Sequence, residues 1–199
     1  PRRTLFTALG IAAALTTLVS VVGMIDSFLL TVDRADAEII GTQPDRIDVG
    51  FDFFYPADAA PVRAVSESPL LRATEPQLQL GGTLLAEDRA DDVDVVVTFL
   101  DFDSSIWRPT AVDGRLDTSR PGIVLARKAA ADLGVEVGDT VTWRHPVREG
   151  LSYTLTTTRL PVVAIHPNPY RFVAYIDSRY VSITNLEGIV NRMAALPAR

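Results

Sequence analysis

The sequence predicts an α+β protein in which one membrane-spanning helix precedes an extracytoplasmic domain. Two observations indicate this fold class. Residues 4–25 carry no charged side chain. Beyond residue 44, segments with the two-residue alternation of strands are interspersed, in mixed order, with short helical segments. The chain shows no repeat of 20–50 residues and no low-complexity segment.

The uncharged run TLFTALGIAAALTTLVSVVGMI, residues 4–25, is expected to form the membrane helix. At about 1.5 Å per residue it spans about 33 Å, enough to cross a hydrocarbon core of about 30 Å. Arg2 and Arg3 precede the run, and acidic residues follow it from Asp26 onward. By the positive-inside rule we expect the N-terminus in the cytoplasm and the chain after about residue 30 outside the cell membrane.

A secreted or singly anchored binding domain is the alternative. RRTLF resembles a twin-arginine export signal, and Ala35–Ala37 matches an Ala-x-Ala cleavage pattern. However, the apolar run is longer than the 7–15 residues typical of a signal peptide, and DSFLLTVDR separates it from the cleavage pattern. We therefore favour a retained helix whose prolongation, the stalk (residues 26–43), leads to an outer domain (residues 44–199).

The outer domain is expected to contain several strands and a few short helices. Apolar and polar residues alternate, or β-branched residues cluster, in seven segments: 45–55, 70–80, 91–102, 123–126, 139–146, 151–166 and 170–177. Residues 56–69 and 127–134 favour short helices, and 103–122 an irregular connection. Residues 178–196 are expected to begin at a Ser178 cap and to become helical toward their end.

Composition excludes some classes of function. The formal net charge of −6 argues against a nucleic-acid partner, which would need a basic face. The absence of cysteine excludes disulfides and thiol chemistry, but not a location outside the cytoplasm.

The segment LGVEVGDTVTW, residues 133–143, resembles a phosphate-binding loop, but only three residues separate its glycines, Gly134 and Gly138, where a P-loop has four. A P-loop also needs a lysine that meets the phosphates, whereas Asp139 stands where a cation is required and would repel them. We interpret Gly134 as a helix cap, and Gly138 with Asp139 as a tight turn that leads into a strand.

Two sets of side chains could be mistaken for metal sites. Asp45, Asp48 and Asp52 lack the glycine and the distant glutamate of a calcium loop, so we interpret them as the solvated face of a strand. His145 and His166 have no neighbouring ligand in the sequence and no evident third ligand. We therefore expect no metal and no other cofactor.

No catalytic constellation can be assembled either. Asp101 and Asp103 could serve as paired carboxylates at a strand end, but a charged, exposed strand terminus is the more frequent use of such residues. Trp107 and Trp143 could face a membrane or a partner, although packing in a core or loop is favoured. The residues alone thus indicate a membrane-anchored domain that makes contacts and is not an enzyme.

Several stretches together resemble a known family. RRTLFTALGIAAAL is similar to the start of the first membrane helix of FtsX-like ABC transporter permeases. DGRLDTSRPGIVLARKAAADLGVEVGDTVTW resembles the MacB-like periplasmic core domain in its Gly114-Arg115, its helix ending in Leu-Gly and its Gly138-Asp139 turn. The later strand LPVVAIH is similar as well, although Ala164 stands where the family usually has glycine.

The resemblance implies a two-lobed periplasmic domain, one lobe α+β and one mostly β, placed after the first membrane helix of a permease. Such a domain performs no catalysis. The resemblance also implies a cytoplasmic ABC ATPase as partner, a permease dimer and contact with membrane lipid. The expected result is the export of a substrate or its extraction from the membrane. The turn at Gly138 would then be an architectural corner of the domain.

Overall fold

The computed structural model describes residues 2–41, 43–85 and 92–198. It divides into two compact units, Pro1–Ala37 and Glu38–Arg199. The first unit is most of a single helix. The second contains every strand of the described chain.

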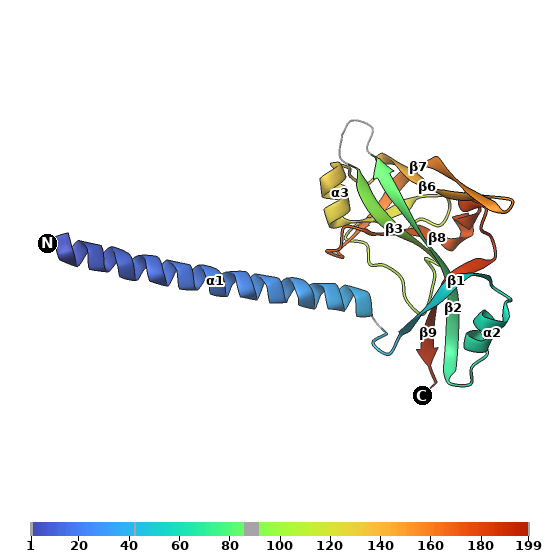
Figure 1. Ribbon diagram of the computed structural model, residues 1–199, viewed down its shortest axis with the longest axis horizontal. Coiled ribbons are helices and arrows are strands. Elements are labelled where there is room, and N and C mark those ends of the chain that lie inside the picture. The colour runs from blue at the N-terminus through green and yellow to red at the C-terminus, as the bar shows by residue number, and fades with distance from the viewer. Residues whose placement is uncertain (1, 42, 86–91, 199) are drawn as a thin grey trace. The chain divides into compact units, whose positions relative to one another are not determined.

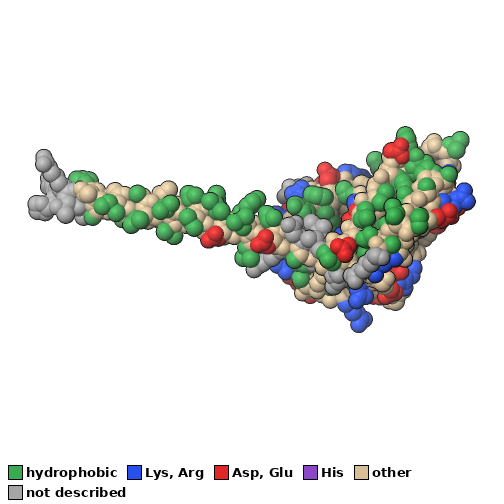
Figure 2. All heavy atoms as spheres, turned by 90° about the horizontal axis from the view of Figure 1, so that it is seen from below, with side chains coloured by type: hydrophobic (Ala, Val, Ile, Leu, Met, Phe, Trp, Pro, Cys, Tyr) green, Lys and Arg blue, Asp and Glu red, His purple; other side chains and the backbone are tan. Residues whose placement is uncertain are grey.

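Helix α1 runs without interruption from Arg2 to Ile40 (Figure 1). Its segment Phe6–Asp33 has a mean hydropathy of 2.2 and is not buried by the rest of the chain, so it is long and apolar enough to cross a membrane. Figure 2 shows hydrophobic side chains along the length of this segment. The hydroxyls of Thr16 and Thr17 donate to carbonyls four residues earlier, each at 2.9 Å. Such internal hydrogen bonds are what polar side chains require in lipid.

The second unit is built on one mixed nine-stranded sheet with three short helices. The strand order is β1-β9-β2-β3-β8-β5-β7-β4, with β6 paired to β2 and β7. The strands are β1 (Ile47–Pro56), β2 (Leu71–Leu85), β3 (Val93–Leu100), β4 (Asp113–Gly114), β5 (Ile123–Ala126), β6 (Thr140–Glu149), β7 (Ser152–His166), β8 (Val173–Asp177) and β9 (Ile189–Pro197). The helices are α2 (Ala60–Ser66), α3 (Arg127–Leu133) and the 3-10 helix η1 (Ser178–Thr184).

Strand β2 connects two parts of this sheet (Figure 1). Its first half pairs with β9, which also pairs with β1, and α2 covers a small core around Val62, Val190 and Met193. Its second half pairs with β3 and borders the main core, in which Phe99 and Trp143 are fully buried. The predicted α+β fold class is confirmed.

The buried segment IVLA shows how the main core forms. As β5 it lies between β7 and β8, and all four side chains are buried, which explains its run of apolar residues. The following helix α3 turns Ala129, Ala130 and Leu133 toward the same core. Short apolar segments of this kind are readable from sequence because both faces are covered.

The expectation for residues 178–196 is wrong in two respects. The cap of η1 is Asp177, whose carboxylate accepts a hydrogen bond from the Arg179 amide at 2.9 Å, and it is not Ser178. The end of the segment is strand β9 and not a helix. Met193 to Leu196 are buried between β1 and β2, so pairing on both sides outweighs the helix propensity of these residues.

Candidate functional site

The backbone amides of the turn at residues 134–139 form hydrogen bonds with other groups of the chain. Gly134 caps α3 in the left-handed conformation with φ 63°, and Gly138 has φ 101°. The amide of Gly138 donates to the carbonyl of Val162 at 2.9 Å. The amide of Glu136 donates to the Asp139 carboxylate at 2.8 Å, and the Asp139 amide to the Glu136 carbonyl at 3.1 Å. Because these amides bond within the chain, they are not arranged to bind a phosphate.

The segment Gly114-Arg115 lies against the same stretch of β7. Gly114 has φ 71°, and a Cβ atom on it would lie 2.3 Å from the carbonyl oxygen of Val163. The amide of Arg115 donates to this oxygen at 3.2 Å. The two motifs that are separate in sequence therefore meet at Val162 and Val163, and only glycine fits at the closest approach.

Asp101 and Asp103 are brought together by an arginine. The Arg179 guanidinium lies 3.4 Å from an Asp101 carboxylate oxygen and 2.5 Å from one of Asp103, and its Nε lies 3.1 Å from the buried carboxylate of Asp177. The pKa of Arg179 is raised, and the largest cause is its hydrogen bond to the Asp103 carboxylate. Asp101 and Asp103 thus each pair with a cation, as expected of structural ion pairs at an exposed strand end.

Both histidine side chains are completely buried. Burial lowers the pKa of His166 to about 4, and its Nδ1 accepts a hydrogen bond from the Asn168 amide at 3.3 Å. Burial also lowers the pKa of His145, whose ring stacks on Trp143 at 3.9 Å between centroids and whose Nε2 lies 2.7 Å from the Thr158 hydroxyl. These rings pack within the core.

Two of the three aspartates near β1, Asp48 and Asp52, have protein partners. Asp48 forms an ion pair with Arg46 at 3.4 Å, and Asp52 accepts a hydrogen bond from the Tyr55 hydroxyl at 3.0 Å. Among the residues that the structure describes, no group of three or more His, Asp or Glu side chains is placed to hold a metal ion.

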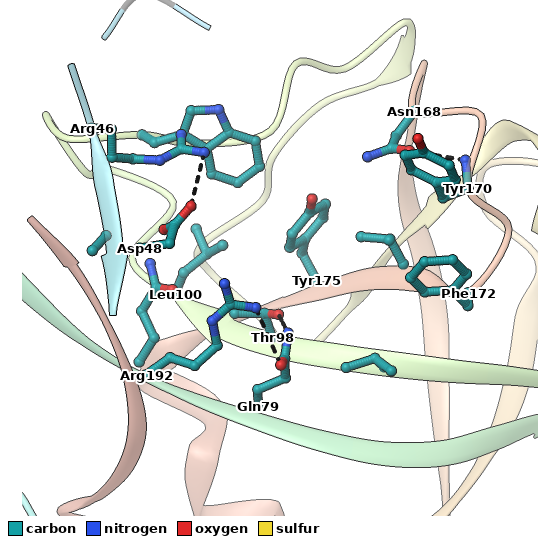
Figure 3. Close-up of a pocket in the computed structure, with 15 residues that line it drawn as sticks. Arg46, Asp48, Gln79, Thr98, Leu100, Asn168, Tyr170, Phe172, Tyr175 and Arg192 are labelled. Atoms are coloured by element: carbon teal, nitrogen blue, oxygen red, sulfur yellow. Dashed lines mark hydrogen bonds and ion pairs between the residues drawn. The ribbon is translucent and has the colours of Figure 1, made fainter. Parts of the chain in front are cut away.

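One concave site of this unit is a groove of about 330 Å³ on one face of the sheet (Figure 3). One end is cationic, with Arg46 and Arg192, and the other is aromatic, with Tyr170 and Phe172; Tyr175 lies between them. The full lining consists of Arg46, Asp48, Gln77, Gln79, Val96, Thr98, Leu100, Trp107, Asn168, Tyr170, Phe172, Val173, Tyr175, Arg192 and Ala194.

The cationic end is fixed by neighbouring side chains. Arg46, whose side chain is only 9% exposed, lies over the Trp107 ring at 4.9 Å from its centroid. Trp107 in turn packs on Tyr175 at 5.4 Å between centroids. Trp107 is thus a partly buried packing residue of a loop, and Trp143 is a core residue.

The sequence interpretation missed this groove. Arg46 directly precedes β1, Arg192 lies in β9, and the aromatic pair lies in the loop before β8. These residues are far apart in the sequence, so no local spacing connects them. The one signal was compositional, because Tyr170 and Phe172 are aromatic residues in a polar, proline-containing loop.

Comparison with known proteins agrees with the resemblance of the motifs. The family model for the MacB-like periplasmic core domain matches residues 4–194. The extracellular domain of the noncanonic ABC-type transporter YknZ from Gram-positive bacteria has a TM-score of 0.52 and 10% identity, over 77% of this chain and 84% of that one. The periplasmic region of MacB from Actinobacillus actinomycetemcomitans has a TM-score of 0.48 and 12% identity, over 77% and 75%. The search of curated proteins gave no match.

The family match covers both the apolar helix and the sheet unit, and the YknZ domain shares the fold of the latter. The motifs at Gly114 and Gly138 both contact β7. The chain therefore belongs to the MacB-like periplasmic core domain family, the extracytoplasmic module of FtsX-like and MacB-like ABC transporter permeases.

Proposed function

We propose that the chain is a non-catalytic segment of an ABC transporter permease. Motion driven by a cytoplasmic ABC ATPase would pass through α1 to the outer domain and serve to export a substrate or to extract it from the membrane. The observation that carries this proposal is the family match over residues 4–194, because it includes an apolar helix and an extracytoplasmic domain in one continuous chain.

The proposed topology follows from the charges around the helix. Arg2 and Arg3 would lie on the cytoplasmic side of the cell membrane and hold the orientation of α1. Residues after about 30, including Asp33, would lie outside. In this arrangement the helix contacts lipid over the part of Phe6–Asp33 that precedes the stalk, which the rest of the chain leaves uncovered.

The stalk is suited to transmit motion because its helix is unbroken. The 39 residues of α1 would span about 58 Å, about twice the thickness of the hydrocarbon core. Residues 26–40 contain neither glycine nor proline. The exposed side chains of Phe28 and Val32 lie four residues apart and would pack on another helix, such as one from a second permease copy.

The chemistry of the side chains supports a role without catalysis. The candidate carboxylates Asp101 and Asp103 are paired to Arg179, and the ring of His166 is buried and kept neutral at physiological pH. A general acid or base needs a reachable proton and a pKa near the working pH. A mechanical role requires neither.

The test uses the complete permease with its ATPase, reconstituted in lipid. Replacing Ala35 and Ala37 with glycine costs roughly 1 kcal/mol each in helix propensity and should reduce transport per ATP hydrolysed. The matched control replaces the same two residues with glutamine, which changes the side chains but keeps a good helix former. If the glycine variant transports as much substrate per ATP hydrolysed as the unmodified permease, at an unchanged melting temperature, the relay is contradicted. The outer domain would then be only a passive binding surface.

Sequencing the N-terminus of the mature protein separates the proposal from the secreted alternative. The permease requires an intact α1. A mature chain that starts at Glu38, directly after Ala35–Ala37, would instead favour a secreted binding domain.

A further inference from the structure

The groove shown in Figure 3 contains an arginine whose position is fixed before any ligand is present. The Arg192 guanidinium donates to the side-chain oxygen of Gln79 at 3.2 Å, and the Gln79 amide nitrogen donates to the Thr98 hydroxyl at 3.1 Å. The backbone of Gln79 is held as well, by two hydrogen bonds with the Asn191 side chain at 2.7 and 2.8 Å. A side chain held in this way loses little freedom when it binds.

The charge of Arg192 is not neutralised by a neighbouring acid within the described residues. Its hydrogen-bond partner Gln79 is an uncharged amide, which occupies one of five guanidinium N–H donors. The acid of the groove, Asp48, is paired with Arg46. The groove lining therefore holds two cations and one anion in a protein whose net charge is −6. This local excess favours an anionic ligand.

The opposite end of the groove offers apolar surface on a fixed backbone. Tyr170 and Phe172 are 48% and 50% exposed, and their rings stack at 5.7 Å between centroids. The Tyr170 amide donates to the side chain of the buried Asn168 at 2.9 Å, and the Phe172 carbonyl accepts from the Val96 amide at 2.6 Å. The rings are thus half exposed although their backbone is anchored, as expected of a surface that binds an apolar group.

We propose that this groove binds a small amphipathic carboxylate. The carboxylate would accept two parallel hydrogen bonds from the Arg192 guanidinium, the geometry that matches the planar fork of arginine. The apolar group would lie against Tyr170 and Phe172. The volume of about 330 Å³ suits a ligand of this size, such as a free peptide C-terminus or an aryl-alkyl acid. The inference does not depend on the transport role, because binding requires neither ATP nor the ATPase.

The test titrates the full chain in detergent with four probes. N-acetyl-Leu-Phe and 4-phenylbutyrate represent the peptide and non-peptide sources, and each is paired with its uncharged amide. Binding is measured by calorimetry and by the fluorescence of Trp107, which lines the groove, while Trp143 is fully buried and serves as a constant background. We expect at least one acid to bind, and its amide to bind about tenfold or more weakly.

Variants decide whether Arg192 is responsible. Arg192→Gln should weaken binding of the acid about tenfold and remove the preference over the amide, whereas Arg63→Gln, an exposed arginine of α2, should change neither. Phe172→Ser, at a half-exposed ring, should weaken the acid and the amide alike. Equal affinity for acid and amide, unchanged binding in Arg192→Gln, or no binding of either acid would overturn the proposal.

Discussion

Replacing Gly114 with alanine should destabilise the outer domain far more than the same change at Gly138. Both glycines have positive φ, so a Cβ atom costs about 1 kcal/mol of left-handed strain at either position. At Gly138 nothing lies within 4 Å of the new atom. At Gly114 the atom would meet the backbone oxygen of Val163 at 2.3 Å, and a backbone atom cannot rotate away as a side chain can.

The displaced backbone should add about 1–3 kcal/mol at Gly114, for a total of about 2–4 kcal/mol. At about 3 °C per kcal/mol for a chain of this size, Gly138→Ala should lower the Tm by about 3 °C and Gly114→Ala by about 6–12 °C. Thermal unfolding followed by circular dichroism measures both. Gly81→Ala is the matched control, because its φ is not positive and nothing lies within 4 Å of the added Cβ, so its Tm should change little. Equal Tm values for the Gly114 and Gly138 variants would refute the assignment of Gly114 to a close backbone approach.

Three further predictions concern the other singled-out residues. Asp139→Ala removes the carboxylate that accepts the turn amide and should cost about 1 kcal/mol, measured as a loss of about 3 °C in Tm, while coupling of transport to ATP stays intact in the folded protein. Asp101→Asn with Asp103→Asn should change the urea midpoint little, because these ion pairs are exposed, whereas Asp177→Asn, at a side chain only 1% exposed, should lower it clearly. Burial lowers the pKa of His166 to about 4 from about 6.5, so the unfolded chain binds the proton more tightly than the folded chain does. The free energy of unfolding should therefore fall by up to about 3 kcal/mol as the pH drops from 6.5 to 4. Urea unfolding of His166→Gln should show a flatter pH dependence.

The local sequence pattern was sufficient to predict the elements whose structure depends mainly on their own residues. The alternation in residues 45–55, the valine-rich run that forms β3 and the Leu-Gly end of α3 each carry their own signal, and each lies where the sequence predicts. The order of the motifs around Gly114 and Gly138 also indicated the family.

Prediction failed where distant residues decide. Residues 193–196 include good helix formers, yet they form a strand because β1 and β2 flank them on both sides. The groove could not be predicted from the sequence for the same reason. Arg46 and Arg192 approach one face only because β1 and β9 are neighbours in the sheet, which no spacing in the chain reveals.

The most direct test of the relay measures movement of the outer domain itself. These 199 residues contain no cysteine, so once any cysteines elsewhere in the permease and its ATPase are replaced, a single dye can be attached at Leu151→Cys, a fully exposed position in the β6–β7 connection. With the permease and its ATPase in nanodiscs that contain an acceptor lipid, energy transfer reports the distance between the dye and the membrane. The relay predicts a change in transfer on addition of ATP, absent when the ATPase is inactive and reduced when Ala35 and Ala37 are replaced with glycine. A signal that ATP does not alter in the intact complex would contradict the account.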